Sequence, residues 1–319
     1  MDNFNASDVS SLDKKVSKHP VMVISAIVML VIGIFGNTVS LVVLCRRRLR
    51  SINIGIFLIV FCLNDLIIVG LFSHQMLSKM FLDGSLLREI MCKYGQFLIY
   101  FTRQFSSWIT VAISAHRMFA ISRPFSARMK KFGWKSQVVT LISIAIILLI
   151  VNIINSRYFH FRHGSCIYDA GILFIVVNSV FYSYLPSLIL ITSTVAIIIT
   201  LCRRPKSWST LKNNNNIFLV LAINIMYLIC SLPPSVVFPL FETEVAKDLT
   251  VKNMMAILSN FDNAFHFVLY MLSGRLFREE LKKLVRRRCQ PSTNSASDAI
   301  KQGRPYVIPG QMEKTPKSQ

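Results

Sequence analysis

Charged residues are scarce in this sequence, and acidic residues are the scarcest of them. Asp, Glu, Lys and Arg make up 16% of the 319 residues, and only 15 residues are acidic against 36 that are basic. A soluble globular domain carries about 25% charged residues, and disordered chains are poor in apolar ones. Because 53% of this chain is apolar, its composition argues against both classes and predicts a membrane protein.

The apolar part of the sequence also lacks the residue sets of membrane enzymes and transporters. An intramembrane enzyme needs paired acids, closely spaced histidines for a metal, or a Ser and Lys set inside the apolar runs, and none of these is present. A transporter is expected to show an inverted repeat, interrupted helices or rows of acids, which are also absent. We therefore expect no enzymatic activity, no metal site and no cofactor.

Seven apolar runs are long enough to cross a bilayer as helices. A transmembrane helix needs about 20 mainly apolar residues. Runs of this kind lie at about 21–45, 54–77, 90–116, 136–156, 170–202, 216–241 and 250–273. The sequence therefore predicts an all-α membrane protein, in which residues 21–273 form a bundle of seven transmembrane helices.

Lysine and arginine are unevenly distributed between the two sides of the predicted bundle. The segments 46–52, 117–135, 203–213 and 275–288 carry 21 of these residues, whereas the segments on the opposite side carry 10. Basic residues near helix ends are retained in the cytoplasm. We therefore expect residues 1–20 to be extracellular and residues 290–319 to form a disordered cytoplasmic tail. The net charge of +21 then faces anionic lipid, and we expect no nucleic-acid partner.

Two extracellular features follow from this orientation. Asn5-Ala6-Ser7 is an N-glycosylation sequon on the exposed terminus. Cys92 heads the third run and Cys166 lies in the loop 157–169, and they are the only cysteines on the oxidising side. These two cysteines are therefore expected to form a disulfide bond.

Short motifs occur in a definite order along the seven runs. At the inner end of the third run the chain reads HRMFAISRPF, from His116 to Phe125. The others are Gly36-Asn37 in the first run, Leu63-Asn64-Asp65-Leu66 in the second, Cys92, Pro186 in the fifth, Cys230-Ser231-Leu232-Pro233 in the sixth and Tyr270 in the seventh. Together they make residues 21–289 resemble the rhodopsin-like (class A) G-protein-coupled receptors. The resemblance implies a plasma-membrane receptor that couples an extracellular ligand to heterotrimeric G proteins, with arrestin as a further partner.

The same resemblance implies roles for residues at the cytoplasmic end. Arg117 is expected to contact the G protein, with Phe125 as an apolar anchor and Tyr270 at the same coupling end. The family also carries an amphipathic helix after the seventh span.

Residues 274–289 fit such a helix. Phe277, Leu281 and Leu284 recur at i, i+4 and i+7 with basic residues on the opposite face, which is typical of a helix in the membrane interface. Cys289 at its end is a palmitoylation candidate.

Several family positions hold other residues in this chain. Where the family has an acid before the arginine of the third helix, this chain has His116, and where it has a tryptophan in the sixth helix, this chain has Ser231. The tyrosine of the fifth helix is replaced by Thr194, and the Asn-Pro pair before Tyr270 is replaced by His266-Phe267. At the position of the lysine that binds retinal in opsins, this chain has Asn260. At the position of the aspartate that binds amines in amine receptors, it has Ile99. These two absences argue against an opsin and an amine receptor.

Arg103 lies in the middle of the third apolar run. At 100° per residue it shares a helix face with Ser106, Thr110, Ser114 and Arg117, so this polar face should look into the bundle. Arg103 lies about 21 Å along the helix from Arg117. The same geometry puts Asp65 and Asp262 in its layer.

A lone guanidinium at this depth costs about 2.5 to 3.5 kcal/mol on insertion scales. We therefore predict a buried ionic layer of Asp65, Arg103, Ser106 and Asp262, in which Arg103 pairs with Asp262. Much of the family holds a sodium ion beside the second-helix aspartate, and we predict that Arg103 is a tethered cation in its place. Whether Arg103 also contacts the ligand is left open.

The outer half of the bundle is where the family places its ligand cavity. By position, the ligand-binding candidates are His74, Gln75, Ile99, Tyr100, Arg103, Gln104, Asn178, Tyr182, Phe238 and Glu242. The loop from Arg157 to Asp169 alternates in the manner of a hairpin with a Gly-Ser turn, as in peptide receptors of this family. A neuropeptide-like ligand is therefore favoured over the alternatives, a chemosensory receptor for small molecules and, less favoured, a transporter.

Overall fold

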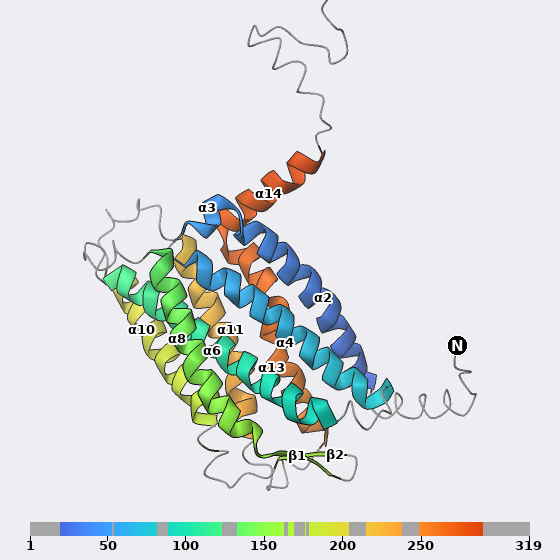
Figure 1. Cartoon of the computed structure of the whole chain (residues 1–319). Helices are drawn as coiled ribbons and strands as arrows, with labels where there is room; N and C mark the ends of the chain where they lie inside the picture. The colour runs from blue at the N-terminus through green and yellow to red at the C-terminus, as the bar shows by residue number, and fades with distance from the viewer. Residues whose placement is uncertain are drawn as a thin grey trace, which may run out of the picture. The chain divides into compact units, whose positions relative to one another are not determined.

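The computed structural model describes residues 20–52, 54–81, 89–122, 133–162, 165–168, 176, 179–203, 215–237 and 249–289. Figure 1 shows a bundle of helices with one small β-hairpin. Each of the seven predicted spans coincides with a long helix. The predicted extracellular terminus before Pro20 and the predicted cytoplasmic tail after Cys289 lie outside the described residues.

Six of the long helices begin and end within about six residues of the predicted spans, whereas the fifth span, predicted from residue 170, is helical in the described residues mainly from Val180 onwards. The long ones are α2 (Pro20–Leu44), α4 (Gly55–Phe81), α6 (Gln96–Ser122), α8 (Trp134–Ser156), α10 (Leu185–Cys202), α11 (Asn215–Val237) and α13 (Leu249–Ser273). One-turn π-helices, η1 (Met91–Gly95) and η2 (Val180–Tyr184), precede α6 and α10, and α3 (Arg47–Arg50) follows α2. The third predicted span therefore extends beyond residue 116, to Ser122.

Five of the described helices are long and apolar enough to cross a membrane, by length and composition alone: α2, α4, α8, α10 together with η2, and α11. The remaining two long helices, α6 and α13, carry rows of buried polar residues. In α6 these include Ser106, Ser107, Thr110 and Ser114, and in α13 they include Ser259, Asn260, Asp262, Asn263 and His266. Polar residues are tolerated at membrane depth where they face the interior of a bundle, so α6 and α13 are the interior helices.

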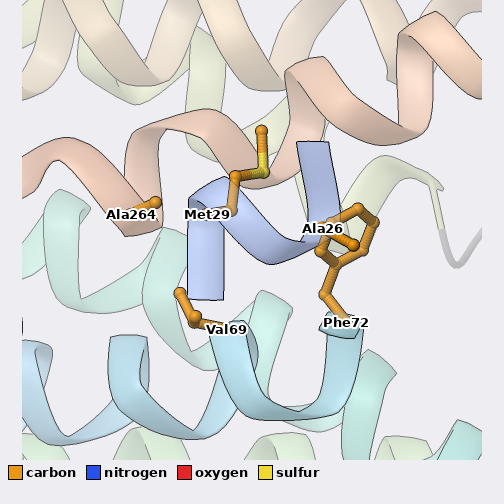
Figure 2. Close-up of a cluster of buried hydrophobic side chains, with 5 residues drawn as sticks. All are labelled: Ala26, Met29, Val69, Phe72 and Ala264. Carbon is orange, nitrogen blue, oxygen red and sulfur yellow. The ribbon is translucent and has the colours of Figure 1, made fainter. Parts of the chain in front are cut away.

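The bundle is held by apolar contacts between helices that are distant in sequence. α2 packs against α4 and α13, and α6 packs against α4, α8 and α10. Figure 2 shows one buried cluster where α2, α4 and α13 meet, formed by Ala26, Met29, Val69, Phe72 and Ala264. On the other side of the bundle, α8 exposes a run of large apolar side chains that includes Ile142, Ile146 and Ile150. Such a surface is suited to lipid rather than water.

The Gly36-Asn37 pair fixes a close approach between α2 and α13. A Cβ atom on Gly36 would lie 2.8 Å from the Cβ atom of Phe267, so only glycine fits without displacement. Asn37 Nδ2 donates a hydrogen bond of 2.9 Å to the main-chain oxygen of Asn263. Both residues of the pair therefore serve the packing of α2 against α13.

The predicted hairpin is present. Strand β1 (Phe159–Arg162) pairs antiparallel with β2 (Ser165–Tyr168), with Phe159 opposite Tyr168 and Arg162 opposite Ser165. Ser165 thus belongs to β2, whereas the prediction placed it in the turn.

The predicted helix after the seventh span is α14 (Arg275–Cys289). Contacts divide the chain into two compact units, Met1–Arg278 and Glu279–Gln319. Within the first unit, the ring of Phe277 lies 5.6 Å from the ring of Tyr270. Within the second, Lys283 Nζ lies 2.8 Å from Glu280 Oε1. The location of α14 in the membrane interface stays a prediction.

Candidate functional site

Arg103 of α6 reaches across to α13, where it meets two neutral side chains. Its Nη1 donates a hydrogen bond of 3.2 Å to Ser259 Oγ, and its Nη2 donates one of 2.9 Å to Asn260 Oδ1. Both acceptors are buried. The two neighbouring acceptors suit the planar fork of a guanidinium, whose donors point in fixed directions.

The predicted ion pair between Arg103 and Asp262 is not formed in this structure. Asp262 Oδ1 instead accepts hydrogen bonds of 3.0 Å from the main-chain nitrogen and from Nδ2 of Asn263. Ser259 and Asn260 lie about one turn closer to the outer end of α13 than Asp262 does, so the guanidinium meets them first. The sequence argument considered only carboxylates as partners and therefore missed both residues.

A small cavity lies beside the Arg103 guanidinium, between α4, α6 and α13. The space between its lining atoms totals about 180 Å³, part of which is open to solvent, and it has no room for a water molecule. The polar residues that line it are Gln75, Thr102, Arg103 and Asn260, and the apolar ones include Phe72 and Ile99. Three of the predicted ligand-binding residues, Gln75, Ile99 and Arg103, are therefore brought together here.

The other predicted ligand residues are placed differently. Gln104 is fully buried, and its Oε1 accepts a hydrogen bond of 2.6 Å from Asn152 Nδ2 of α8, so Gln104 joins two helices instead of lining the cavity. The ring of Tyr100 lies 5.7 Å from that of Phe159 in the hairpin. His74 Nδ1 is buried without a hydrogen-bond partner.

Tyr182 interacts with the Arg103 side chain both through its charge and through a side-chain hydrogen bond. Asn178, Phe238 and Glu242 lie outside the described residues. The described part of the candidate site is thus centred on Arg103 and its neighbours on α4 and α13.

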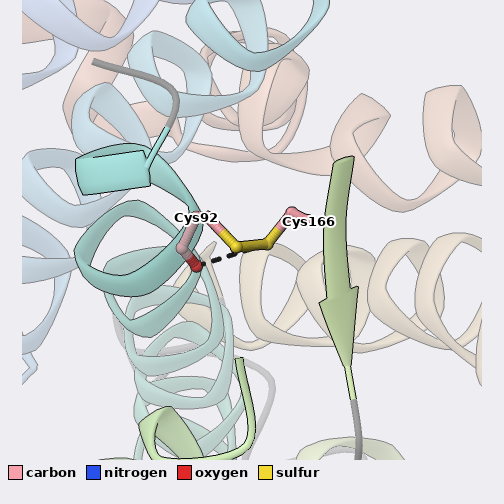
Figure 3. Close-up of a disulfide and its surroundings, with 2 residues drawn as sticks. All are labelled: Cys92 and Cys166. Atoms are coloured by element: carbon pink, nitrogen blue, oxygen red, sulfur yellow. Dashed lines mark hydrogen bonds between the residues drawn. A yellow bond between two sulfur atoms is a disulfide. The ribbon is translucent and has the colours of Figure 1, made fainter. Parts of the chain in front are cut away.

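The hairpin is attached covalently to the outer end of the third helical segment. Cys92 in η1 and Cys166 in β2 form a disulfide, with their Cα atoms 5.3 Å apart. Figure 3 shows this bond joining the helix to the strand. The predicted disulfide is confirmed, and it holds the hairpin strands above the start of α6.

The sequence matches one known protein family over most of its length. The family of seven-transmembrane receptors of the rhodopsin type matches residues 36–273, which is most of the chain. The chain belongs to this receptor family. It is therefore a multi-pass membrane receptor and not an enzyme, with an extracellular ligand and a G protein as its partners. No curated protein matches the chain at a significant level.

Below the cavity, the receptor has a second buried polar cluster. His266 Nδ1 of α13 lies 2.8 Å from Asp65 Oδ2 of α4, and both side chains are almost fully buried. Ser106 of α6 is also buried. Of the predicted ionic layer, Asp65 therefore pairs with His266, a residue that the sequence argument noted only as a departure from the family.

His266 takes one of the oxygens that a sodium ion of the family would use, whereas Asp65 Oδ1 and Asn263 Oδ1 are buried without a hydrogen-bond partner in the described part of the chain. One oxygen of Asp65 is already bound by His266, and the position that offers an amide oxygen elsewhere offers an imidazole here. Hard cations prefer oxygen ligands. The cation predicted to replace sodium was Arg103, but the side chain that lies against Asp65 is His266.

At the inner end of the bundle, His116 and Arg117 are both buried, with Arg117 only 4% exposed. Within the described ranges, Arg117 Nε has no hydrogen-bond partner and no carboxylate lies at ion-pair distance from Arg117. The family has an acid directly before this arginine, and here no other acid among the described residues pairs with Arg117 in its place.

A hydrogen-bond network joins α6, α10 and α11 just above Arg117. Asn224 Nδ2 of α11 donates to Ser114 Oγ at 2.8 Å and to Thr194 Oγ1 at 2.9 Å. Tyr227 donates from its hydroxyl to Ser107 Oγ at 3.0 Å. Thr194 therefore takes part in holding α10 to α11, although it lacks the ring that the family carries there.

The third predicted coupling residue, Tyr270, is fully buried on α13. Its hydroxyl lies 3.7 Å from Cys62 Sγ of α4, which donates to it. Phe125 lies outside the described residues, as does Asn5, and nothing is described of the Cys289 side chain.

Proposed function

We propose that this receptor binds an extracellular peptide, of the kind that acts as a neuropeptide. The observation that carries the proposal is the hairpin β1–β2, which is tied by Cys166 to the outer end of the third helical segment. A rigid hairpin at this place resembles that of peptide receptors in the family.

The polar and aromatic character of the candidate site supports the same proposal. Arg103 and Gln75 line the cavity, and Tyr100 links α6 to the hairpin through Phe159. A ligand with both charged and apolar groups, such as a peptide, matches this lining better than a lipid does.

At the inner end, Arg117 is proposed to contact the G protein, with Phe125 as an apolar anchor and Tyr270 as part of the same coupling end. Ligand binding then shifts the population from inactive to active bundles. The hydrogen bonds of Asn224 to Ser114 and Thr194 lie where α11 has to separate from α6 and α10 to admit a partner.

The remaining proposals concern placement and modification. The excess of Lys and Arg on one side supports an extracellular N-terminus in the plasma membrane. Asn5 is then a glycosylation site and Cys289 a palmitoylation site that fixes α14 to the membrane interface. Arrestin is proposed as a further cytoplasmic partner.

The ligand class is tested by activation of G proteins in cells that express the receptor. Pools of peptides and pools of small metabolites are applied separately, and the dissociation of G-protein subunits is recorded. We expect activation by a peptide pool, and we expect Arg117→Ala at equal surface expression to abolish it. Activation by metabolite pools alone would instead establish the alternative, a chemosensory receptor for small molecules.

A further inference from the structure

The short helix α3 (Arg47–Arg50) concentrates positive charge at the inner end of α2. The chain reads RRRLR from Arg46 to Arg50, so four of these five residues are arginines. No Asp or Glu occurs between Asp13 and Asp65. The charge of this turn is therefore not balanced by acids that lie nearby in the sequence.

The backbone of α3 is packed tightly against α4. Leu49 is only 3% exposed, and α3 contacts both α2 and α4. A Cβ atom on Gly55, the first residue of α4, would lie 2.5 Å from the main-chain oxygen of Leu49 and 2.7 Å from that of Arg50. Only glycine permits so close an approach, so α3 has a defined place beside the start of α4.

Hydrogen bonds close the turn on itself. The main-chain nitrogen of Arg50 donates a hydrogen bond of 2.9 Å to the main-chain oxygen of Arg46. Ser51 ends the helix, because its nitrogen donates to the oxygen of Arg47 at 3.1 Å and its Oγ donates to the oxygen of Arg48 at 3.1 Å. The turn is therefore a formed structural element and not an extended linker.

Three arginine side chains lie on the side of α3 that is not packed. At 100° per residue, Arg47, Arg48 and Arg50 are centred on the face opposite Leu49, and all three are exposed. Neither Arg47 nor Arg50 forms an ion pair with another described residue. The turn thus presents several guanidinium groups together, next to the end of a transmembrane helix.

We propose that α3 binds the phosphorylated headgroup of a phosphoinositide lipid in the inner leaflet. This leaflet is anionic, and clusters of about four to eight Lys and Arg immediately cytoplasmic of a transmembrane helix recognise phosphoinositides. A guanidinium binds phosphate oxygens bidentately, and an inositol ring with several phosphates offers one to each of Arg47 and Arg50. A lipid is favoured over a protein partner because α3 directly follows α2 and so stays at the membrane surface. The choice of leaflet rests on the orientation proposed above, whereas the peptide function is not needed.

Thermal unfolding of the full-length purified receptor in lipid nanodiscs tests the proposal without an agonist or a G protein. One series of nanodiscs contains phosphatidylcholine with increasing mole fractions of phosphatidylinositol bisphosphate. A second series carries the same negative charge as phosphatidylserine. The unfolding temperature of the wild type should rise with the phosphoinositide, and more than it does with phosphatidylserine. No rise, or an equal rise in the two series, overturns the proposal.

The double variant Arg47→Gln/Arg50→Gln removes two of the exposed charges. The mole fraction of phosphoinositide that gives half of the rise should increase by about 10- to 30-fold. The matched control Lys135→Gln/Arg203→Gln removes the same charge from exposed positions at the inner ends of α8 and α10, and it should respond as the wild type does. An unchanged response of the α3 double variant, or an equal loss in the control variant, contradicts a site on α3.

Two further measurements exclude other partners of α3. Soluble inositol trisphosphate is titrated into receptor in phosphatidylcholine nanodiscs, and a rise equal to that caused by the lipid would overturn a membrane-bound headgroup. Nucleotide exchange on G proteins is also measured in phosphatidylcholine nanodiscs. An Arg47→Gln/Arg50→Gln receptor that keeps the lipid response but is slower in this exchange would show that the arginines bind the G protein, and would refute the lipid site.

The choice of leaflet is tested separately, because both leaflets of a nanodisc have the same composition. A tag is fused to the N-terminus, and antibody binding to it is measured on intact and on permeabilised cells. The tag should be labelled on intact cells, which places α3 at the inner leaflet. Labelling only after permeabilisation would place α3 at the outer leaflet and overturn the proposal, whichever lipid binds in nanodiscs.

Discussion

His266 Nδ1 of α13 lies 2.8 Å from Asp65 Oδ2 of α4, in the layer where the family holds its sodium ion. The imidazole occupies one oxygen of the carboxylate, which leaves fewer oxygen ligands for sodium in this layer. We predict that the thermal unfolding temperature of the purified receptor is the same in sodium chloride and in N-methylglucamine chloride of equal ionic strength. A wild type that is clearly stabilised by sodium would disprove this.

The variant His266→Asn provides the positive control for that experiment. Asparagine frees Asp65 Oδ2 and adds an amide oxygen, which restores the type of ligand that hard cations prefer. The unfolding temperature of this variant should therefore become higher in sodium chloride than in N-methylglucamine chloride. If it stays indifferent to sodium, the imidazole is not what excludes the ion.

His116 precedes the buried Arg117, and neither a neighbouring carboxylate nor another described acid holds Arg117. An ion pair at this place would stabilise the inactive bundle, so its absence should raise basal signalling. We expect His116→Asp to lower basal G-protein activation, since it supplies the missing partner. His160→Asp, the same substitution at an exposed hairpin position, should have no such effect. Unchanged or higher basal activity in His116→Asp at equal surface expression would count against the idea.

The disulfide between Cys92 and Cys166 closes a separation of 74 residues. Loss of a native disulfide costs roughly 2 to 5 kcal/mol in small domains, so Cys92→Ser and Cys166→Ser should each reduce surface expression, measured by antibody binding to intact cells. The double variant should be no worse than either single one, because the same bond is lost. Cys202→Ser, at a free and exposed cysteine, serves as the control. Normal expression of the single variants, or free thiols at both positions in the mature wild type, would refute the prediction.

Gly36 and Gly70 offer a matched pair of substitutions. A Cβ atom on Gly36 meets Phe267 Cβ at 2.8 Å, whereas one on Gly70 meets nothing within 4 Å. Gly36→Ala should therefore lower stability by about 1 to 3 kcal/mol through overpacking. Gly70→Ala should be neutral or stabilising by about 0.5 to 1 kcal/mol, because alanine favours the helix. Thermal unfolding of the two variants in the same detergent decides this, and equal unfolding temperatures would contradict the close approach of α2 and α13.

Most of the fold could be predicted from the sequence, because length and hydropathy determine where a helix crosses a membrane. The hairpin followed from alternation in the loop, and the disulfide from the side on which Cys92 and Cys166 lie. The prediction failed for Ser165, which proved to be part of β2, because alternation indicates that two strands are present but does not determine the residue at which each one begins.

The partners of the buried charges could not be predicted in the same way. Sequence spacing placed Arg103, Asp65 and Asp262 in one layer, but it did not determine which side chains meet. Arg103 donates hydrogen bonds to Ser259 and Asn260, and Asp65 pairs with His266. Their spacing on α13, at i, i+1 and i+7, was a usable signal for one polar face. It was passed over because only carboxylates were considered as partners of an arginine.

We propose above that this receptor passes an extracellular signal to a G protein through the inner end of α6. It is tested most directly by reconstituting the purified receptor in lipid nanodiscs with purified heterotrimeric G proteins of each class and measuring guanine-nucleotide exchange, with and without the peptide pools. We expect the wild type to accelerate nucleotide exchange on at least one G protein and a peptide pool to increase the rate further. Arg117→Ala should abolish both effects. Exchange on every G protein that remains at the rate of empty nanodiscs, with the peptide pools present, would contradict it.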